Sequence, residues 1–274
     1  MREIDKIYHQ LCYNLIHNGE KVGNTRELRN VKITLHDITD NVVSIRNISP
    51  SYLFAEWIWY FKGRNDVKFI SQFASKWKNI SDDGITNNSA YGFLMKEAYG
   101  FDQIKKIIEL LKKDPNSRRA VINLNIPNEK VIETKDEPCT ICLQFYIRKN
   151  KLYCTGIMRS NDIWFGFPYD IAFFTLLQRY IADSLSIEYG HYNHFVTSIH
   201  VYERNIKDIN AIMSDYNGNE IIYDYDKFFN NLDFVESLLR ISIDKCSPEF
   251  NKKYILTLAK KYFGYREENY KNEN

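Results

Sequence analysis

The chain has 274 residues, 44% of them hydrophobic and 15% aromatic, which is enough for one large domain or two small ones with a real core. Its 37 lysines and arginines nearly balance 35 acidic residues, and the net charge of +2 argues neither for nor against a polyanionic partner. No apolar run has the length of a membrane span, the N-terminus lacks the apolar core of a secretion signal, and the five cysteines are too scattered for a disulfide framework. We therefore expect a cytoplasmic protein without a membrane partner.

Hydrophobic periodicity predicts both helices and strands. In chain order, the predicted helices cover residues 4–16, 51–61, 102–112 and 169–185. The predicted strands cover residues 31–35, 119–125, 139–148, 152–158 and 195–202, and Lys149-Asn150-Lys151 is a hairpin signal between two of them. The two kinds of element are mixed without a βαβ rhythm. We therefore expect one α+β domain over residues 1–274, built on a large sheet, with a frayed charged tail at 265–274.

The spacing of Cys139 and Cys142 is found in redox and zinc motifs, but a single pair lacks the second half of a four-ligand zinc site. Residues three apart in a strand also point to opposite faces. His191 and His194 have no carboxylate or cysteine partner at ligand spacing. We expect no metal site.

Asp170 lies in an aromatic and aliphatic run, Phe165–Ile171, where a bare carboxylate is costly unless something pairs with it. The simplest interpretation is a helix start. Pro168 suits a first helical position, and an acid in the first turn suits the helix dipole.

Arginine stands beside serine in two compact polar motifs, 116–119 and 159–162. Planar guanidinium donors together with a short hydroxyl donor are suited to binding phosphate, although each motif alone also fits a solvated strand end. Cys139 alone is more typical of a buried small hydrophobe than of a nucleophile. Nearby arginines change that balance because positive charge favours the reactive thiolate.

Taken in order, these motifs resemble those of thymidylate synthases and, more closely, those of cytidylate hydroxymethylases. The resemblance covers residues 51–205, and its motifs are Glu56 in the aromatic segment 54–63, Ala90-Tyr91-Gly92, Ser117-Arg118-Arg119, Pro138-Cys139 leading to Gln144-Phe145-Tyr146, Arg159-Ser160-Asn161-Asp162, the segment 165–170, and His200-Val201-Tyr202. It implies a thymidylate synthase-like α+β fold, with a large mixed β-sheet flanked by helices. It also implies a homodimer packed sheet to sheet, in which each active site borrows arginines from the partner.

Three departures from the synthases point to a different reaction. Synthases have asparagine where this chain has Asp170, and a carboxylate suits the amino group of cytosine but opposes the carbonyl of uracil. A mispaired polar contact of this kind can reject the wrong substrate by about 10⁴-fold. Thr140 follows the cysteine where synthases usually have histidine, and Trp77 lacks the second tryptophan that synthases often carry. These features imply hydroxymethylation of dCMP, with 5,10-methylenetetrahydrofolate as the one-carbon donor.

The resemblance also assigns roles. Cys139 adds to carbon 6 of the pyrimidine as a nucleophile, and Glu56 organises the proton transfers and the water that completes the hydroxymethyl group. The implied substrate ligands are Asp170 and Gln144, then Arg159 and Ser160 with Arg118 and Arg119 of the partner subunit for the phosphate, Arg26 as a weaker phosphate ligand, and His200 and Tyr202 for the sugar. The implied folate ligands are Trp77, Tyr91 and Asp162.

Other functions stay open at this point. The first is a hydroxymethylase for the ribonucleotide CMP in a nucleoside antimetabolite pathway. The second is a thymidylate synthase that methylates dUMP, which Asp170 and Thr140 oppose. The third is a single-strand nucleic-acid platform of aromatic and basic residues. It leaves Cys139, Glu56 and Asp170 without a role, so we expect no nucleic-acid partner.

Overall fold

The computed structural model describes residues 2–46, 48–127, 129–214 and 253–257. The chain divides into two compact units. The first consists of Met1–Arg46, Gln103–Asn125 and Cys139–Ile221, and the second of Asn47–Asp102, Ile126–Pro138 and Ile222–Asn274. A single catalytic domain over residues 1–274 remains a prediction. The tail expected at 265–274 lies outside the described residues.

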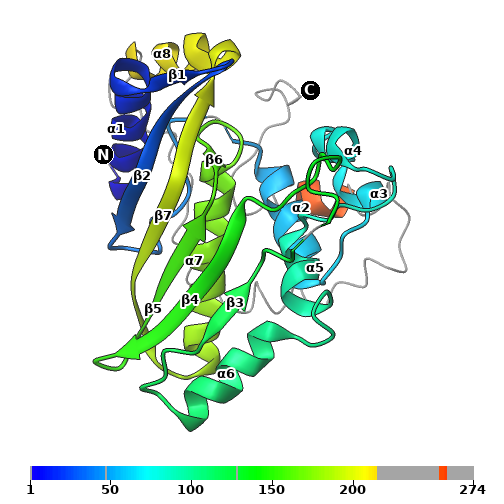
Figure 1. Ribbon diagram of the computed structural model, residues 1–274. Helices are drawn as coiled ribbons and strands as arrows, with labels where there is room; N and C mark the ends of the chain where they lie inside the picture. The colour runs from blue at the N-terminus through cyan, green and yellow to red at the C-terminus, as the bar shows by residue number, and fades with distance from the viewer. Residues whose placement is uncertain (1, 47, 128, 215–252, 258–274) are drawn as a thin grey trace. The chain divides into compact units, whose positions relative to one another are not determined.

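The first unit is built on a mixed sheet, whose strand order is β1-β2-β7-β5-β4-β3, with β6 beside β7 (Figure 1). Within the described residues, its strands are β1 (Glu20–Val22), β2 (Thr25–Leu35), β3 (Val121–Asn123), β4 (Thr140–Arg148), β5 (Lys151–Met158), β6 (Asn161–Asp162) and β7 (Glu188–Tyr202). β5 and β6 run parallel to β7, and the other pairs are antiparallel. This mixed sheet with its helices confirms the predicted α+β fold class.

The turn between β4 and β5 is as short as its sequence predicts. Arg148 pairs with Lys151, so the loop consists of Lys149 and Asn150 alone. Both residues have positive φ, 50° and 57°, as a two-residue turn of the primed type requires. This turn fixes the register of β4 against β5. In that register, buried residues such as Leu143 alternate with half-buried ones in the middle of β4.

The helices of the first unit pack on this sheet or on one another. They are α1 (Glu3–Asn18), α6 (Gln103–Lys113), α7 (Phe167–Ser184) and α8 (Ile206–Ser214), with the 3-10 helix η1 (Glu203–Asn205) before α8. α7 contacts β5 and β7 and runs behind the strands in Figure 1, while α1 contacts β2. α7 is buried on nearly all sides, and its first turn carries Pro168 and Asp170 as predicted.

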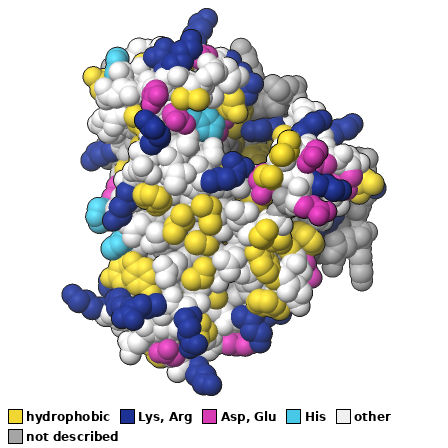
Figure 2. Space-filling model, viewed as in Figure 1, with side chains coloured by type: hydrophobic (Ala, Val, Ile, Leu, Met, Phe, Trp, Pro, Cys, Tyr) yellow, Lys and Arg dark blue, Asp and Glu magenta, His cyan; other side chains and the backbone are white. Residues whose placement is uncertain are grey.

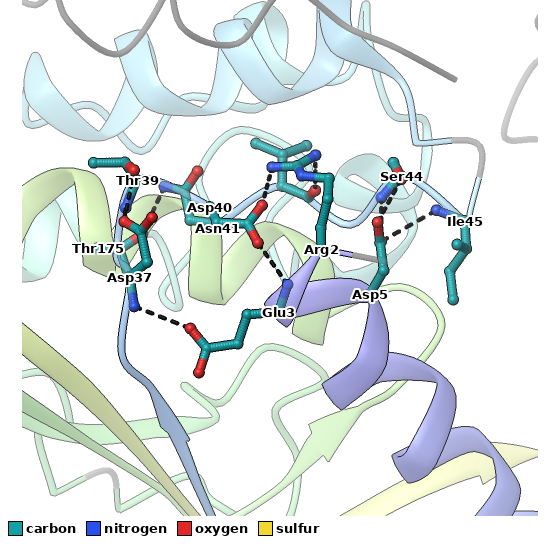
Figure 3. Close-up of polar contacts among 11 residues, drawn as sticks. Arg2, Glu3, Asp5, Asp37, Thr39, Asp40, Asn41, Ser44, Ile45 and Thr175 are labelled. Atoms are coloured by element: carbon teal, nitrogen blue, oxygen red, sulfur yellow. Dashed lines mark hydrogen bonds and ion pairs between the residues drawn. The ribbon is translucent and has the colours of Figure 1, made fainter. Parts of the chain in front are cut away.

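Polar contacts join the segment after β2, residues 36–46, to both α1 and α7 (Figure 3). Asp40 accepts a hydrogen bond from the backbone N–H of Glu3 at 2.7 Å, and Asp5 accepts one from the backbone N–H of Ser44 at 2.7 Å. Asn41 donates to Thr175 of α7 at 2.7 Å. These contacts satisfy buried polar groups near the first turn of α1, where carboxylates also suit the helix dipole.

The second unit contains helices α2 (Pro50–Phe61), α3 (Val67–Ile70), α4 (Lys76–Ile80) and α5 (Tyr91–Lys96). α2 begins after Ser49, whose side chain accepts a hydrogen bond from the backbone N–H of Tyr52. The helix is buried on almost every side. α5 approaches α2 closely at Gly92, where a Cβ atom would lie 2.2 Å from the backbone of Tyr60. A glycine is therefore required at that position by packing.

Most predicted elements are present, with shifted ends. The strand expected at 195–202 begins at Glu188, and the strand expected at 31–35 begins at Thr25. These two strands pair from Thr25 opposite Tyr202 to Leu35 opposite Tyr192, with a break only at Asn30. Pairing extends both strands into polar segments that periodicity alone leaves as loops. In the described part of the chain, no helix is long and apolar enough to cross a membrane.

Candidate active site

Cys139 lies just before β4, beside the end of β5. Its carbonyl oxygen accepts a hydrogen bond from the backbone N–H of Arg159 at 2.9 Å, and Thr140 pairs with Met158. The thiol is half-buried. The predicted nucleophile and a predicted phosphate ligand therefore start from directly neighbouring backbone positions.

The other cysteines of the described chain are poorly suited to nucleophilic attack. Burial raises the pKa of the Cys12 thiol to about 12, and it raises the pKa of Cys142 and, more strongly, that of Cys154. A raised pKa keeps the thiol protonated near neutral pH, and the thiolate is the reactive form. Cys139 and Cys142 are both free thiols.

The segment that follows Arg159 lies beside the end of β7. Asp162 in β6 pairs with His200 in β7, and Ser160 Oγ lies 3.4 Å from His200 Nδ1. The rings of His200 and Tyr202 are 5.4 Å apart between centroids, in an edge-to-face arrangement. Parallel pairing of β6 with β7 thus gathers the predicted phosphate and sugar ligands at one end of the sheet.

Asp162 has one carboxylate oxygen bonded and one without a partner. Oδ1 accepts from the backbone N–H groups of Trp164 at 2.8 Å and Phe165 at 3.2 Å, which closes the turn before α7. Oδ2 is buried and has no hydrogen-bond partner among the residues that the structure describes. A buried acceptor without a partner is costly, so this oxygen suits a donor from a bound molecule.

Asp170, in the first turn of α7, is half-buried and bonded to a second polar side chain. Its Oδ2 accepts a hydrogen bond from Nδ2 of Asn161 at 2.7 Å. The contacts continue inward, since Asn161 Oδ1 lies 3.0 Å from His194 Nε2, and His194 Nδ1 lies 2.9 Å from the hydroxyl of Tyr192. Sequence reasoning considered His194 only as a metal ligand. The alternation of β7, which turns both Tyr192 and His194 inward, was the available signal.

On the side of β4 that faces β3, Gln144 contacts the segment that carries Arg118 and Arg119. The side chain of Gln144 donates to the carbonyl of Arg118 at 3.0 Å, which fixes the backbone that carries both arginines. The side chains of Arg118 and Arg119 are exposed, and neither makes a hydrogen bond or ion pair with any described residue.

Arg26, in β2, is engaged within the chain. Its guanidinium pairs with Glu203 at 3.2 Å and donates to the carbonyl of Ile16 at 2.8 Å. These contacts connect β2 with the end of α1 and with η1. A phosphate role for Arg26 stays a prediction, and it would require the loss of these contacts.

Three predicted site residues, Glu56, Trp77 and Tyr91, lie in the second unit and belong to one aromatic cluster. Glu56 is buried and accepts a short hydrogen bond from the hydroxyl of Tyr52, which itself accepts from Trp77 Nε1 at 2.9 Å. Tyr60 OH lies 3.4 Å from Glu56, and the rings of Tyr60 and Tyr91 are 5.4 Å apart. The sequence analysis missed Tyr52 and Tyr60, although each lies four residues from Glu56 and therefore on the same face of a helix.

In the described parts of the chain, no group of three or more histidine, cysteine, aspartate or glutamate side chains could hold a metal ion.

Comparison with known proteins relates the chain to the thymidylate synthase family. The sequence model for "Thymidylate synthase" matches residues 6–220. Two phage proteins named deoxyuridylate hydroxymethyltransferase, from Pseudomonas phage M6 and Bacillus phage SP01, are each 34% identical, over 161 and 170 residues. These segments cover 58% and 57% of this chain but only 46% and 44% of the phage proteins, so the chain spans less than half of their length. The thymidylate synthase of Francisella philomiragia is 28% identical over 188 residues, which cover 63% of this chain and 69% of that protein.

Proposed function

This chain belongs to the thymidylate synthase family, and from that membership we propose that it is a folate-dependent dCMP 5-hydroxymethyltransferase. It transfers a one-carbon unit to carbon 5 of dCMP, and addition of water gives 5-hydroxymethyl-dCMP. The observation that carries this proposal is the carboxylate of Asp170, whose Oδ2 accepts from Asn161 at 2.7 Å in the first turn of α7.

Base preference follows from the donor and acceptor pattern that Asp170 meets. An ionised carboxylate only accepts hydrogen bonds. The amino group of cytosine donates, whereas the corresponding oxygen of uracil accepts. Uracil would therefore place a carbonyl oxygen against anionic oxygen, and a polar site left mispaired in this way discriminates strongly.

Cys139 is the proposed nucleophile. Its thiolate adds to carbon 6 of the ring, which makes carbon 5 electron-rich, and the same sulfur leaves when the ring is restored. The other described cysteines are held protonated by burial, which supports this assignment. Glu56 is the proposed proton-transfer group, and its short hydrogen bond from Tyr52 holds the carboxylate in one orientation.

The nucleotide would be held by the group at the end of β5, β6 and β7. Arg159 and Ser160 would bind the phosphate, and His200 with Tyr202 would bind the sugar. The short separation of Ser160 and His200 supports a compact arrangement of phosphate and sugar ligands.

Methylenetetrahydrofolate is the one-carbon donor of this family. When bound, it would supply a carbon at the oxidation level of formaldehyde. The residues present fit a pterin, because Asp162 Oδ2 is a buried acceptor without a partner in the described chain and pterins carry N–H donors. Trp77 and Tyr91 would supply aromatic surface for the cofactor.

We also propose a homodimer packed sheet to sheet, with Arg118 and Arg119 reaching the phosphate of the partner. In the view of Figure 1, the described helices of the first unit do not lie in front of its central strands, and hydrophobic side chains gather over these strands in Figure 2. Half-buried Ile157 pairs with Phe195 on one side and with Cys142 on the other, which gives an apolar row across three strands. A second copy would cover this row.

A second candidate is hydroxymethylation of dUMP. The names of the two phage relatives favour it, at 34% identity. CMP hydroxymethylation and methylation of dUMP to thymidylate are further alternatives, and one experiment distinguishes all four.

In that experiment, the enzyme is incubated with methylenetetrahydrofolate and with dCMP, CMP or dUMP, and each product is weighed by mass spectrometry. We expect dCMP to gain CH₂O, with release of the hydrogen at carbon 5 and no accumulation of dihydrofolate, because water rather than hydride completes the product. A product heavier by CH₂, with stoichiometric dihydrofolate seen by absorbance, would identify a methylating synthase instead. Faster turnover of dUMP or CMP would replace dCMP as the substrate.

A further inference from the structure

We propose that Asn161, His194 and Tyr192 form a buried relay of hydrogen bonds that orients Asp170 as an acceptor and so determines which pyrimidine base the enzyme prefers. They would act as positioning residues. This inference rests on the proposed function, because it assigns a cause to the base preference of that same site.

Hydrogen-bond chemistry gives the relay one direction. A carboxylate oxygen can only accept from an amide, so Nδ2 of Asn161 must face Asp170 and Oδ1 must face His194. His194 Nε2 must then carry the proton, which leaves Nδ1 as an acceptor for the hydroxyl of Tyr192. Every donor meets an acceptor only in this order.

Burial removes the competing protonation states. Asn161 is 2% exposed, and His194 and Tyr192 are fully buried. Burial lowers the pKa of His194 to about 3, so the ring is neutral near neutral pH and keeps one acceptor nitrogen. It also raises the pKa of Tyr192 well above its usual value, so the hydroxyl keeps the proton that it donates.

Two glycines make room for the relay. At Gly156, in β5, a Cβ atom would lie 2.3 Å from the hydroxyl oxygen of Tyr192. At Gly166, a Cβ atom would lie 2.8 Å from Asn161 Nδ2 and 3.2 Å from Asp170 Oδ2. Neither glycine has positive φ, so the space for the relay, rather than the backbone conformation, requires a glycine at these positions.

Removal of the hydroxyl of Tyr192, at the far end of the relay, should therefore change the orientation or the protonation of Asp170. Without the hydroxyl of Tyr192, His194 can exchange tautomers, and the amide of Asn161 can turn its oxygen toward the carboxylate. That orientation is repulsive, so Asp170 would rotate away or take up a proton. In either case it loses its fixed role as an acceptor for the amino group of cytosine.

The test compares Tyr192→Phe, His194→Phe and His194→Gln with wild-type enzyme, by the ratio of kcat/KM for dCMP to that for dUMP. We expect the two phenylalanine variants to lower this ratio by about tenfold, the size of one lost hydrogen bond to a charged group. His194→Gln should recover part of it, because its amide can still donate to Asn161. Tyr8→Phe makes the same change at a fully buried tyrosine outside the relay, and should leave the ratio unchanged. Thermal melts confirm that each variant is folded at the assay temperature.

A second readout does not depend on turnover. Long-range ¹H–¹⁵N correlation spectra of histidine-labelled wild-type enzyme report each ring tautomer, and the spectrum of His194→Gln identifies the His194 signals. We expect a neutral ring with its proton on Nε2. A proton on Nδ1, a charged ring near neutral pH, or an unchanged ratio in Tyr192→Phe and His194→Phe would overturn the relay. A wild-type preference for dUMP would contradict the proposed function instead, and the tautomer would then decide the relay alone.

Discussion

At the scale of single residues, the proposed bond to the base depends on one sulfur atom, that of Cys139, and the proposed base preference depends on one carboxylate, that of Asp170. Cys139→Ala removes the sulfur while leaving the backbone hydrogen bond from Arg159 in place. We expect turnover to be abolished and nucleotide binding, measured by calorimetry, to be largely kept, because the proposed phosphate and sugar ligands are untouched. Cys142→Ala is the matched control and should keep most of the activity, since burial raises the pKa of that thiol. Near-normal turnover by Cys139→Ala would end the nucleophile assignment.

Asp170→Asn tests the base-reading carboxylate. An amide has both a donor and an acceptor, so the variant suits the carbonyl and ring N–H of uracil. We expect kcat/KM for dCMP to fall by about 100-fold or more and activity on dUMP to appear. Asp183→Asn, near the other end of α7, should change neither value. If Asp170→Asn keeps its full preference for cytosine, Asp170 is only the acid of a helix start.

At the scale of elements, the relay requires a glycine, Gly156, where β5 contacts β7. Gly156→Ala should destabilise the protein by about 1–3 kcal/mol, because the new methyl group would overlap the hydroxyl of Tyr192. The same substitution in a Tyr192→Phe background should cost clearly less, since the atom that it meets is gone. Chemical denaturation of the single and double variants gives this coupling directly. Equal costs in both backgrounds would place the clash elsewhere, for example at Leu143.

The sequence predicted what depends on local pattern. Helical spacing located α1, α2, α6 and α7 within a few residues of their ends, and the positive-φ turn at Lys149 and Asn150 was visible as a hairpin signal. The family motifs named Cys139 and Asp170 as site residues, and their roles remain proposals.

What the sequence did not predict depends on pairing between distant segments. The long β2–β7 ladder and the short β6 strand exist only when both partners are in place. The contact of Asn161 with His194 joins residues 33 positions apart, so the local alternation that turns His194 inward does not identify its partner. The same holds for Trp77 and Tyr52, which meet across 25 positions.

At the scale of the whole molecule, two features point to an active site completed by another copy. Arg118 and Arg119 extend from the chain without a side-chain partner among the described residues, although Gln144 fixes the backbone that carries them. One face of the sheet presents the half-buried apolar row of Cys142, Ile157 and Phe195. If two copies pack through this face, the arginines of one can reach the phosphate bound by the other.

Hybrid dimers test this arrangement. Arg119→Ala and Cys139→Ala should each be inactive or nearly so as pure proteins, but a re-equilibrated equal mixture should recover about a quarter of the wild-type activity. Half of the dimers are then hybrids, and each hybrid has one site with both residues intact. The control mixes Arg159→Ala with Cys139→Ala. Because Arg159 and Cys139 are neighbours in one chain, no hybrid site is intact and no activity should return. Native mass spectrometry confirms that hybrids form. If they form and the Arg119→Ala mixture stays inactive, Arg119 acts within its own subunit.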